Sequence, residues 1–278
     1  MQALLSNDII NHPAIQAGAI PFLLALLAGA LLPRRLPWWS ALVFAIGYFC
    51  AAWLILDGRL TPLTSPRKLV ILGAAAVVVG LAYDALRAAT TRLRNVPLLL
   101  AVAGVTWLIW PKLASADNWQ RLLMFSAAGG YAVWLCFALR QLQDEDIGSS
   151  ISATLLGLAS GICALLGASA LLGELAIAVG SGAAAIALFG LTRRIDHGSG
   201  FNYTVAVLTA LIGIAAVLYA KVPWYALVAL AGIPLLAMLL EWRYTPAIGR
   251  IVWLTLLTSI PAAIAIGISW RAAGPIPL

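Results

Sequence analysis

Polar residues that accompany glycine or proline inside apolar stretches are the main candidates for chemistry in this sequence. Glycine and proline interrupt apolar helices and free backbone amides and carbonyls for ligand binding. Such positions predict a binding site for a small neutral, zwitterionic or lipid-like molecule, lined by Gly180, Ser181, Gly182, Tyr131, Ser259 and Pro261. The alternative is that these residues only pack helices together, because Gly and Pro are frequent in transmembrane helices.

Charged residues that could act as acids, bases or metal ligands lie at the ends of the apolar stretches. They are Asp57, Asp84, Glu174, Glu241 and Arg271. Charge at the centre of a bilayer is costly and marks ion or proton pathways where it occurs. Its placement at the ends disfavours a proton pump, a proton-coupled antiporter, a retinal protein and a charge-lined channel.

Two short polar segments hold the remaining candidates. The acidic run Asp144–Asp146 could bind a cation, although a solvated loop that caps the next helix is favoured. Asp196 and His197 are adjacent, which is not the spacing of a catalytic pair. The sequence has no Walker A, zinc, GxSxG or CxxC motif. We therefore predict no catalytic residue, metal site or cofactor.

The composition indicates the class of protein. Of 278 residues, 63% are hydrophobic and only 10% are charged, and the mean hydropathy is +1.00. A soluble domain carries about 25% charged residues. This excludes a soluble enzyme, a disordered tail and, despite a net charge of +7, a nucleic-acid-binding module. We expect an all-α polytopic integral membrane protein, with residues 1–278 as a single transmembrane domain in the lipid bilayer.

Hydropathy predicts about ten transmembrane helices, because a span needs about 20 apolar residues. The predicted ranges are 14–32, 37–56, 67–85, 97–111, 121–142, 151–172, 174–191, 203–220, 223–241 and 248–271. Residues 151–191 are too long for one crossing, so we place a turn at Gly173–Glu174.

Tryptophan and cysteine positions add to this interpretation. Ten of the 11 tryptophans lie near the ends of predicted spans, where indole rings anchor at the membrane interface, and Trp134 is the exception. Cys50, Cys136 and Cys163 all lie in apolar stretches without metal or redox spacing. We expect them to be small buried hydrophobic residues.

Lysine and arginine are distributed unevenly between the two sides. The side reached after each odd-numbered span has ten of them: Arg34, Arg35, Arg87, Arg92, Arg94, Arg140, Arg193, Arg194, Arg243 and Arg250. The other side has seven: Arg59, Arg67, Lys68, Lys112, Arg121, Lys221 and Arg271. The positive-inside rule then predicts that both termini are non-cytoplasmic. The Ala-, Gly-, Leu- and Trp-rich style is typical of a bacterial inner-membrane protein.

The two halves of the chain, 14–142 and 151–271, have a similar layout of spans. Five spans per half would invert the second half relative to the first, as in the inverted repeats of many carriers. Even spacing of spans can also produce this layout without a true repeat. Gly157 and Gly161 form a GxxxG pair, which predicts close helix packing within this chain or with a partner.

Two functions follow from these patterns. The first is a non-catalytic accessory or scaffold subunit of a larger membrane complex, with other membrane-protein subunits as partners. The second is a secondary carrier. In length and number of spans the chain is similar to the drug/metabolite transporter class of carriers, although it shares no motif with that class and its predicted termini lie on the opposite side.

Overall fold

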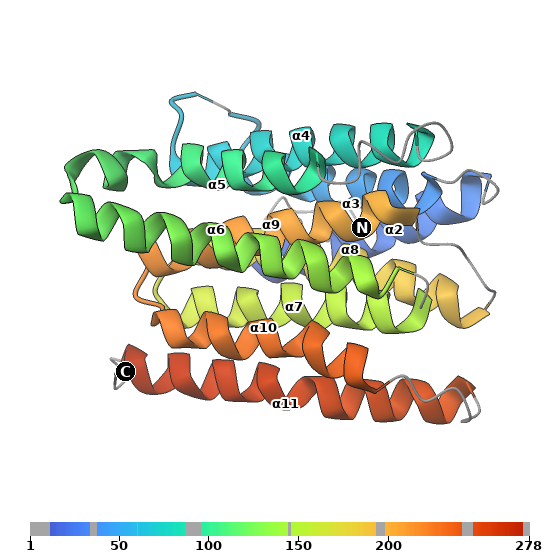
Figure 1. The fold of residues 1–278 in the computed structure, drawn as a ribbon. Coiled ribbons are helices and arrows are strands. Elements are labelled where there is room, and N and C mark those ends of the chain that lie inside the picture. The colour runs from blue at the N-terminus through green and yellow to red at the C-terminus, as the bar shows by residue number, and fades with distance from the viewer. Residues whose placement is uncertain are drawn as a thin grey trace.

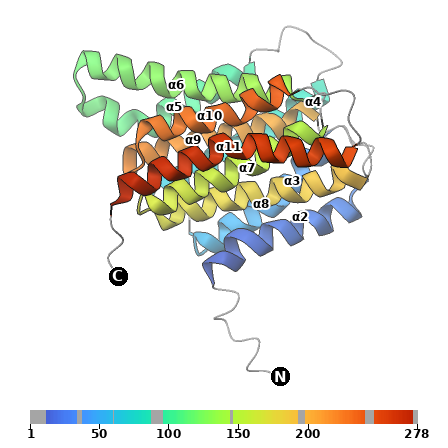
Figure 2. The same ribbon diagram turned by 90° about the horizontal axis from the view of Figure 1, so that it is seen from below.

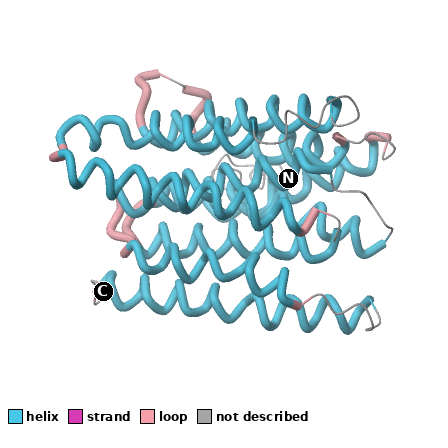
Figure 3. Tube along the Cα trace, in the orientation of Figure 1, coloured by secondary structure: helices cyan, strands magenta, loops and turns pink. Residues whose placement is uncertain are grey.

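The computed structural model describes residues 12–33, 38–59, 61–86, 96–143, 146–192, 198–240 and 247–274, and this part of the chain is helical without strands (Figures 1 and 3). Its elements are η2 (Ile15–Ala19), α2 (Ile20–Leu31), α3 (Trp39–Ile55), α4 (Ser65–Leu86), α5 (Val96–Ser115), α6 (Asn118–Gln141), α7 (Asp146–Leu166), α8 (Ala170–Thr192), α9 (Gly198–Tyr219), α10 (Trp224–Leu239) and α11 (Ala247–Ala273). The π-helical turn η2 continues directly into α2. Helices are expected here, because a helix satisfies its own backbone hydrogen bonds in lipid.

Each predicted apolar range contains a helix, but the helices differ in length. Seven are long and apolar enough to cross a membrane, namely α4, α5, α6, α7, α8, α9 and α11. Among the shorter ones, α3 has 17 residues and α10 has 16. That is about 25 Å at 1.5 Å per residue, slightly less than a hydrocarbon core of about 30 Å. The protein is a polytopic helical membrane protein.

Consecutive helices run antiparallel (Figure 1). The even-numbered helices α2 to α10 therefore end on one side of the bundle, where the odd-numbered helices α3 to α11 begin. We name this side the basic end, because the sequence predicts ten of the 17 Lys and Arg residues there. The other side is named the opposite end.

Helix α9 is the centre of the bundle (Figure 2). Every residue from Ser199 to Ala216 is buried except Tyr203. Helices α3 to α8 all contact it. A helix that is hydrophobic on all sides is stable when other helices surround it, so α9 acts as the common core of the bundle.

The turn between α7 and α8 lies at Gly167–Ser169, so the predicted turn at Gly173–Glu174 is wrong. Ser169 N–H bonds to the Ala164 carbonyl at 3.0 Å, and Ala168 N–H bonds to the Leu165 carbonyl at 3.0 Å. This is a Schellman motif, whose left-handed residue is Ala168, with φ 65°. Hydropathy does not detect such a turn, because all of its residues are small or apolar.

Glycines on α7 and α8 bring these two helices into close contact. A Cβ atom on Gly157 would lie 2.3 Å from the backbone nitrogen of Gly180. A Cβ atom on Gly161 would lie 2.9 Å from the Gly173 carbonyl oxygen. Both glycines of the GxxxG pair therefore face α8 of the same chain. Gly173 takes part in this helix contact, and the turn begins six residues earlier, at Gly167.

Most of the described tryptophans are exposed. Trp53, Trp107, Trp110, Trp119, Trp224, Trp253 and Trp270 are each at least 40% exposed. Trp39 is an exception in addition to Trp134, because it is buried and packs edge-on against Phe189 with ring centroids 5.4 Å apart. Trp242 lies outside the described residues.

Two of the three cysteines are buried as predicted. Cys136 and Cys163 lie in the core, whereas Cys50 on α3 is exposed. The prediction for Cys50 was wrong, because hydropathy does not distinguish the lipid-facing side of an apolar helix from its packed side.

Candidate functional site

The start of α9 carries polar groups that face other helices. Residues 198–202 are Gly-Ser-Gly-Phe-Asn, and Ser199, Gly200 and Asn202 are buried. The first N–H groups of a helix have no partner within that helix, and buried polar groups need hydrogen bonds. Neighbouring helices must therefore supply partners. We name the resulting cluster the α9 collar: Asp84, Gln143, Ser149, Ser199, Gly200 and Asn202.

Asp84 on α4 caps α9 from the side. Its carboxylate accepts the N–H of Gly200 at 2.9 Å, and the residue is only 7% exposed. The partial positive charge of a helix N-terminus stabilises a carboxylate. Helices α4 and α9 lie very close to each other at this point. A Cβ atom on Gly80 would lie 2.8 Å from the Gly200 carbonyl oxygen, and glycine avoids this clash. Asp84 is thus a buried residue of the helix contact, although its place in the sequence suggested only a span end.

Two further bonds complete the collar. Ser199 Oγ donates to Gln143 Oε1 at 2.8 Å, just beyond the end of α6. Ser149 Oγ on α7 donates to Asn202 Oδ1. The collar therefore joins α4, α6 and α7 to the central helix at the basic end. Because each bond crosses between helices, the arrangement holds the register of α9.

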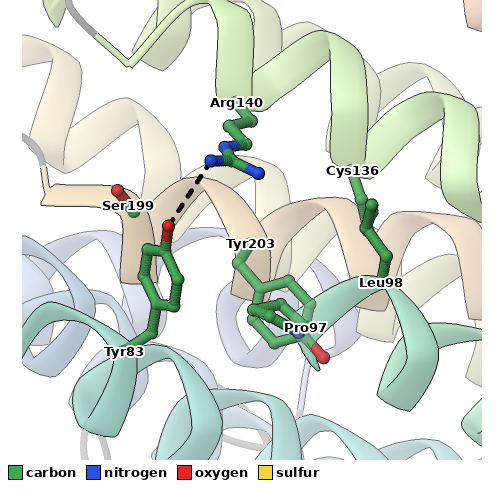
Figure 4. Close-up of a pocket in the computed structure, with 7 residues that line it drawn as sticks. All are labelled: Tyr83, Pro97, Leu98, Cys136, Arg140, Ser199 and Tyr203. Atoms are coloured by element: carbon green, nitrogen blue, oxygen red, sulfur yellow. Dashed lines mark hydrogen bonds between the residues drawn. The ribbon is translucent and has the colours of Figure 1, made fainter. Parts of the chain in front are cut away.

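A small cavity lies beside the collar (Figure 4). It has a volume of about 30 Å³ and is lined by Tyr83, Pro97, Leu98, Cys136, Arg140, Ser199 and Tyr203. An Arg140 guanidinium N–H donates to Tyr83 Oη at 3.5 Å, and Figure 4 shows this bond among the lining residues. A water molecule needs about 10–15 Å³ of such space. The cavity has room for one or two water molecules between a cationic and a hydroxyl-bearing wall.

The sequence-predicted binding residues on α8 lie in helix contacts. Gly180 faces α7, where an added Cβ atom would lie 2.6 Å from the backbone nitrogen of Leu158. Gly182 faces α3, where a Cβ atom would lie 3.3 Å from the ring of Phe44. Ser181 between them is buried. These three residues therefore serve two different helix contacts.

The other predicted binding residues lie on separate helices. The Tyr131 hydroxyl would be 3.6 Å from a Cβ atom on Gly213, which places it between α6 and α9. Ser259 Oγ donates to the Leu256 carbonyl of its own helix at 2.7 Å. Pro261 faces Gly232 across the contact of α10 and α11. None of the six predicted residues lines the cavity beside the collar.

Tyr131 belongs to a second group of polar side chains, in the half of the bundle toward the opposite end. Its hydroxyl and that of Ser160 are buried without a hydrogen-bond partner among the described residues. Cys163, one turn after Ser160 on α7, neighbours both Tyr131 and Ser269. Buried hydroxyls without partners are uncommon in proteins, so this group is a candidate for contact with a small polar molecule.

Sequence reasoning missed the collar because the predicted start of α9, at residue 203, was five residues late. Ser199 and Asn202 therefore looked like loop residues. The signal that could have found them is the Gly-Ser-Gly start, which is typical of a helix N-terminus. Asp146 begins α7, and the acidic residues 144 and 145 and the Asp196–His197 pair lie outside the described residues.

Comparison with known proteins adds no relative. No protein-family model matches the chain, and no curated protein matches it. Within the described residues, His, Cys, Asp and Glu side chains form no group that could hold a metal ion.

Proposed function

We propose that this protein is a non-catalytic accessory or scaffold subunit of a larger membrane complex in a bacterial inner membrane. The observation that carries the proposal is the α5–α6 hairpin, whose tip projects beyond the rest of the bundle (Figures 1 and 2). Because this tip lies beyond the other helices, its exposed side chains are available to another subunit.

The projection can be measured from one hydrogen bond. The Tyr219 hydroxyl, at the end of α9, donates to the Leu108 carbonyl of α5 at 3.1 Å. Helix α5 continues from there to Ser115, which is about 10 Å at 1.5 Å per residue. From residue 117 to 127, every residue except Met124 is exposed. Because 11 consecutive residues cover all sides of a helix, the first turns of α6 contact few of the described residues outside α5.

The same helix carries a small-residue surface that could receive a partner helix. Ser126 and Gly130 are four residues apart, so they share one face of α6, and both are exposed. A Cβ atom on Gly130 would meet no atom within 4 Å. Small residues allow close approach of transmembrane helices. Like Gly157, Gly130 has a small residue four positions away, but none of the described helices packs on it.

Native mass spectrometry after mild extraction tests this proposal. Wild-type protein is expected to co-purify with other polypeptides in fixed stoichiometry. Gly130→Leu should reduce that co-purification at least tenfold, because the new side chain fills the approach surface. Gly267→Leu on α11 is the matched control, since a Cβ atom there also meets nothing within 4 Å. A free monomer in the wild-type extract, or equal loss in both variants, contradicts the proposal.

A carrier for a small neutral, zwitterionic or lipid-like molecule is the alternative, and the buried Tyr131 hydroxyl favours it. A transported molecule could supply the hydrogen bonds that Tyr131 and Ser160 do not make with the described residues. This function predicts a retained small molecule in the extracted monomer and its loss in Tyr131→Phe. A monomer that retains no small molecule in either form argues against a carrier.

The arrangement in the membrane is part of the proposal. We propose ten crossings, with the three shorter helices included, and the basic end in the cytoplasm. Helix pairing supports two inverted halves, since α2–α3 and α5–α6 pack as hairpins, as do α7–α8 and α10–α11. The equivalent helices α4 and α9 run in opposite directions and contact each other, as an inverted repeat requires.

A further inference from the structure

A groove on the outside of the bundle is separate from the collar and from the α5–α6 hairpin. It has a volume of about 240 Å³ and is bounded by α2, α7, α8 and α11. Phe22 on α2 and Thr255 on α11 lie at its two sides, and Ala184 and Ala187 of α8 lie between them. Figure 2 shows α8 between α2 and α7 on this side of the bundle.

The groove follows from the sequence of α8. Ala184, Ala187, Leu188 and Leu191 are spaced as one face of a helix, and all four line the groove. Because alanine side chains are short, this face of α8 is recessed relative to the neighbouring helices α2 and α11. The only polar side chain of the α7 wall is Thr154, whose hydroxyl donates to the Ser150 carbonyl at 2.8 Å. The lining therefore offers an apolar surface.

The size of the groove selects its occupant. One turn of an α-helix, 10–12 Å wide with a 5.4 Å pitch, takes roughly 400–600 Å³. A groove of about 240 Å³ does not enclose a whole helix, so a partner helix could insert only side chains there, whereas a hydrocarbon chain is thin enough to lie along it. In a bilayer the available hydrocarbon is the acyl chain of a lipid.

The position of the groove selects the headgroup. Leu191 lies one residue before the end of α8, and Ile151 lies five residues after the start of α7, so the groove reaches the basic end. The sequence predicts ten of the 17 Lys and Arg residues on that side, and eight of these ten lie outside the described residues. Basic residues near the membrane surface attract anionic lipids. We propose that this groove holds an acyl chain of an anionic phospholipid.

The test compares lipids and variants by native mass spectrometry of the full chain in mild detergent. The probes are phosphatidylglycerol and phosphatidylcholine, added at equal concentration. Wild-type protein is expected to retain phosphatidylglycerol at least tenfold better. Ala187→Leu, which fills the groove, should lose that retention tenfold or more. Ala263→Leu, an equal change at an exposed position of α11 outside the groove, should keep it.

Three results would overturn the proposal. One is equal retention of phosphatidylglycerol by wild type and Ala187→Leu. Another is equal retention of both lipids by wild type. The third is loss of a co-purifying polypeptide in Ala187→Leu without change in lipid, which assigns the groove to a protein partner. Failure of the subunit proposal would show instead in Gly130→Leu, so the two proposals are tested separately.

Discussion

Asp84 shows how a single carboxylate can organise an apolar bundle. Its bond to Gly200 spans 116 positions in sequence and satisfies one of the unpaired N–H groups at the start of α9. A buried carboxylate is tolerated there because the helix N-terminus carries partial positive charge. The bond therefore fixes the position of α4 against the start of α9.

Replacing Asp84 should destabilise the fold in a graded way. Asp84→Ala leaves the Gly200 N–H without its acceptor and is expected to cost about 1–3 kcal/mol. Asp84→Asn keeps an oxygen acceptor and should cost less. The destabilisation of both variants is measured from their unfolding midpoints in detergent with increasing dodecyl sulfate. Equal midpoints for wild type and Asp84→Ala would show that this bond contributes nothing.

Ala168 is held in a conformation that suits glycine. Its φ of 65° is left-handed, which costs a residue with a Cβ atom about 1–2 kcal/mol. Ala168→Gly should therefore raise the free energy of unfolding by about 1 kcal/mol. Ala127→Gly on the exposed face of α6 is the control, and it should lower that free energy by about 1 kcal/mol. The same unfolding assay measures both variants. A lower free energy of unfolding in both would refute the expectation.

At the scale of elements, glycines determine which helices can approach closely. Gly157 and Gly180 allow α7 and α8 to pack backbone to backbone, and Gly80 and Gly200 do the same for α4 and α9. In a membrane the helices gain no hydrophobic driving force from each other, so close packing of small residues has a large share in their association.

A methyl group at Gly157 should disturb the α7–α8 contact. The new Cβ atom would lie 2.3 Å and 2.5 Å from backbone atoms of Gly180, which cannot move aside as a side chain can. We expect Gly157→Ala to cost about 1–3 kcal/mol. Gly267→Ala, with nothing within 4 Å, should be neutral or slightly stabilising. Thermal unfolding of the two purified variants provides the comparison.

At the scale of the whole molecule, the bundle combines a buried central helix with exposed surfaces of different shape. Helix α9 is buried from Ser199 to Ala216 except at Tyr203, the α5–α6 hairpin projects, and the groove beside α8 is recessed. A projecting surface favours a protein partner, and a narrow recess favours a lipid chain. The molecule therefore offers two separate contacts to its surroundings.

The proposed orientation can be tested with reporter fusions. An enzyme that is active only outside the cytoplasm should be active when fused to either terminus, because ten crossings return the chain to its starting side. The same enzyme inserted after Gln143, between α6 and α7, should be inactive. Activity at only one terminus would require an odd number of crossings, and the reverse pattern would invert the orientation.

Local composition determined the helices of this protein. Each predicted apolar range contains one, because about 20 apolar residues in lipid have to satisfy their backbone within the segment. The turn at Ala168 escaped prediction, because its geometry depends on backbone bonds and not on hydropathy. The contacts were decided only by tertiary structure. Asp84 meets Gly200, and Trp39 is buried against Phe189, because other helices pack at those positions. Hydropathy shows that a segment is apolar, but only the packed neighbours decide which of its sides faces lipid.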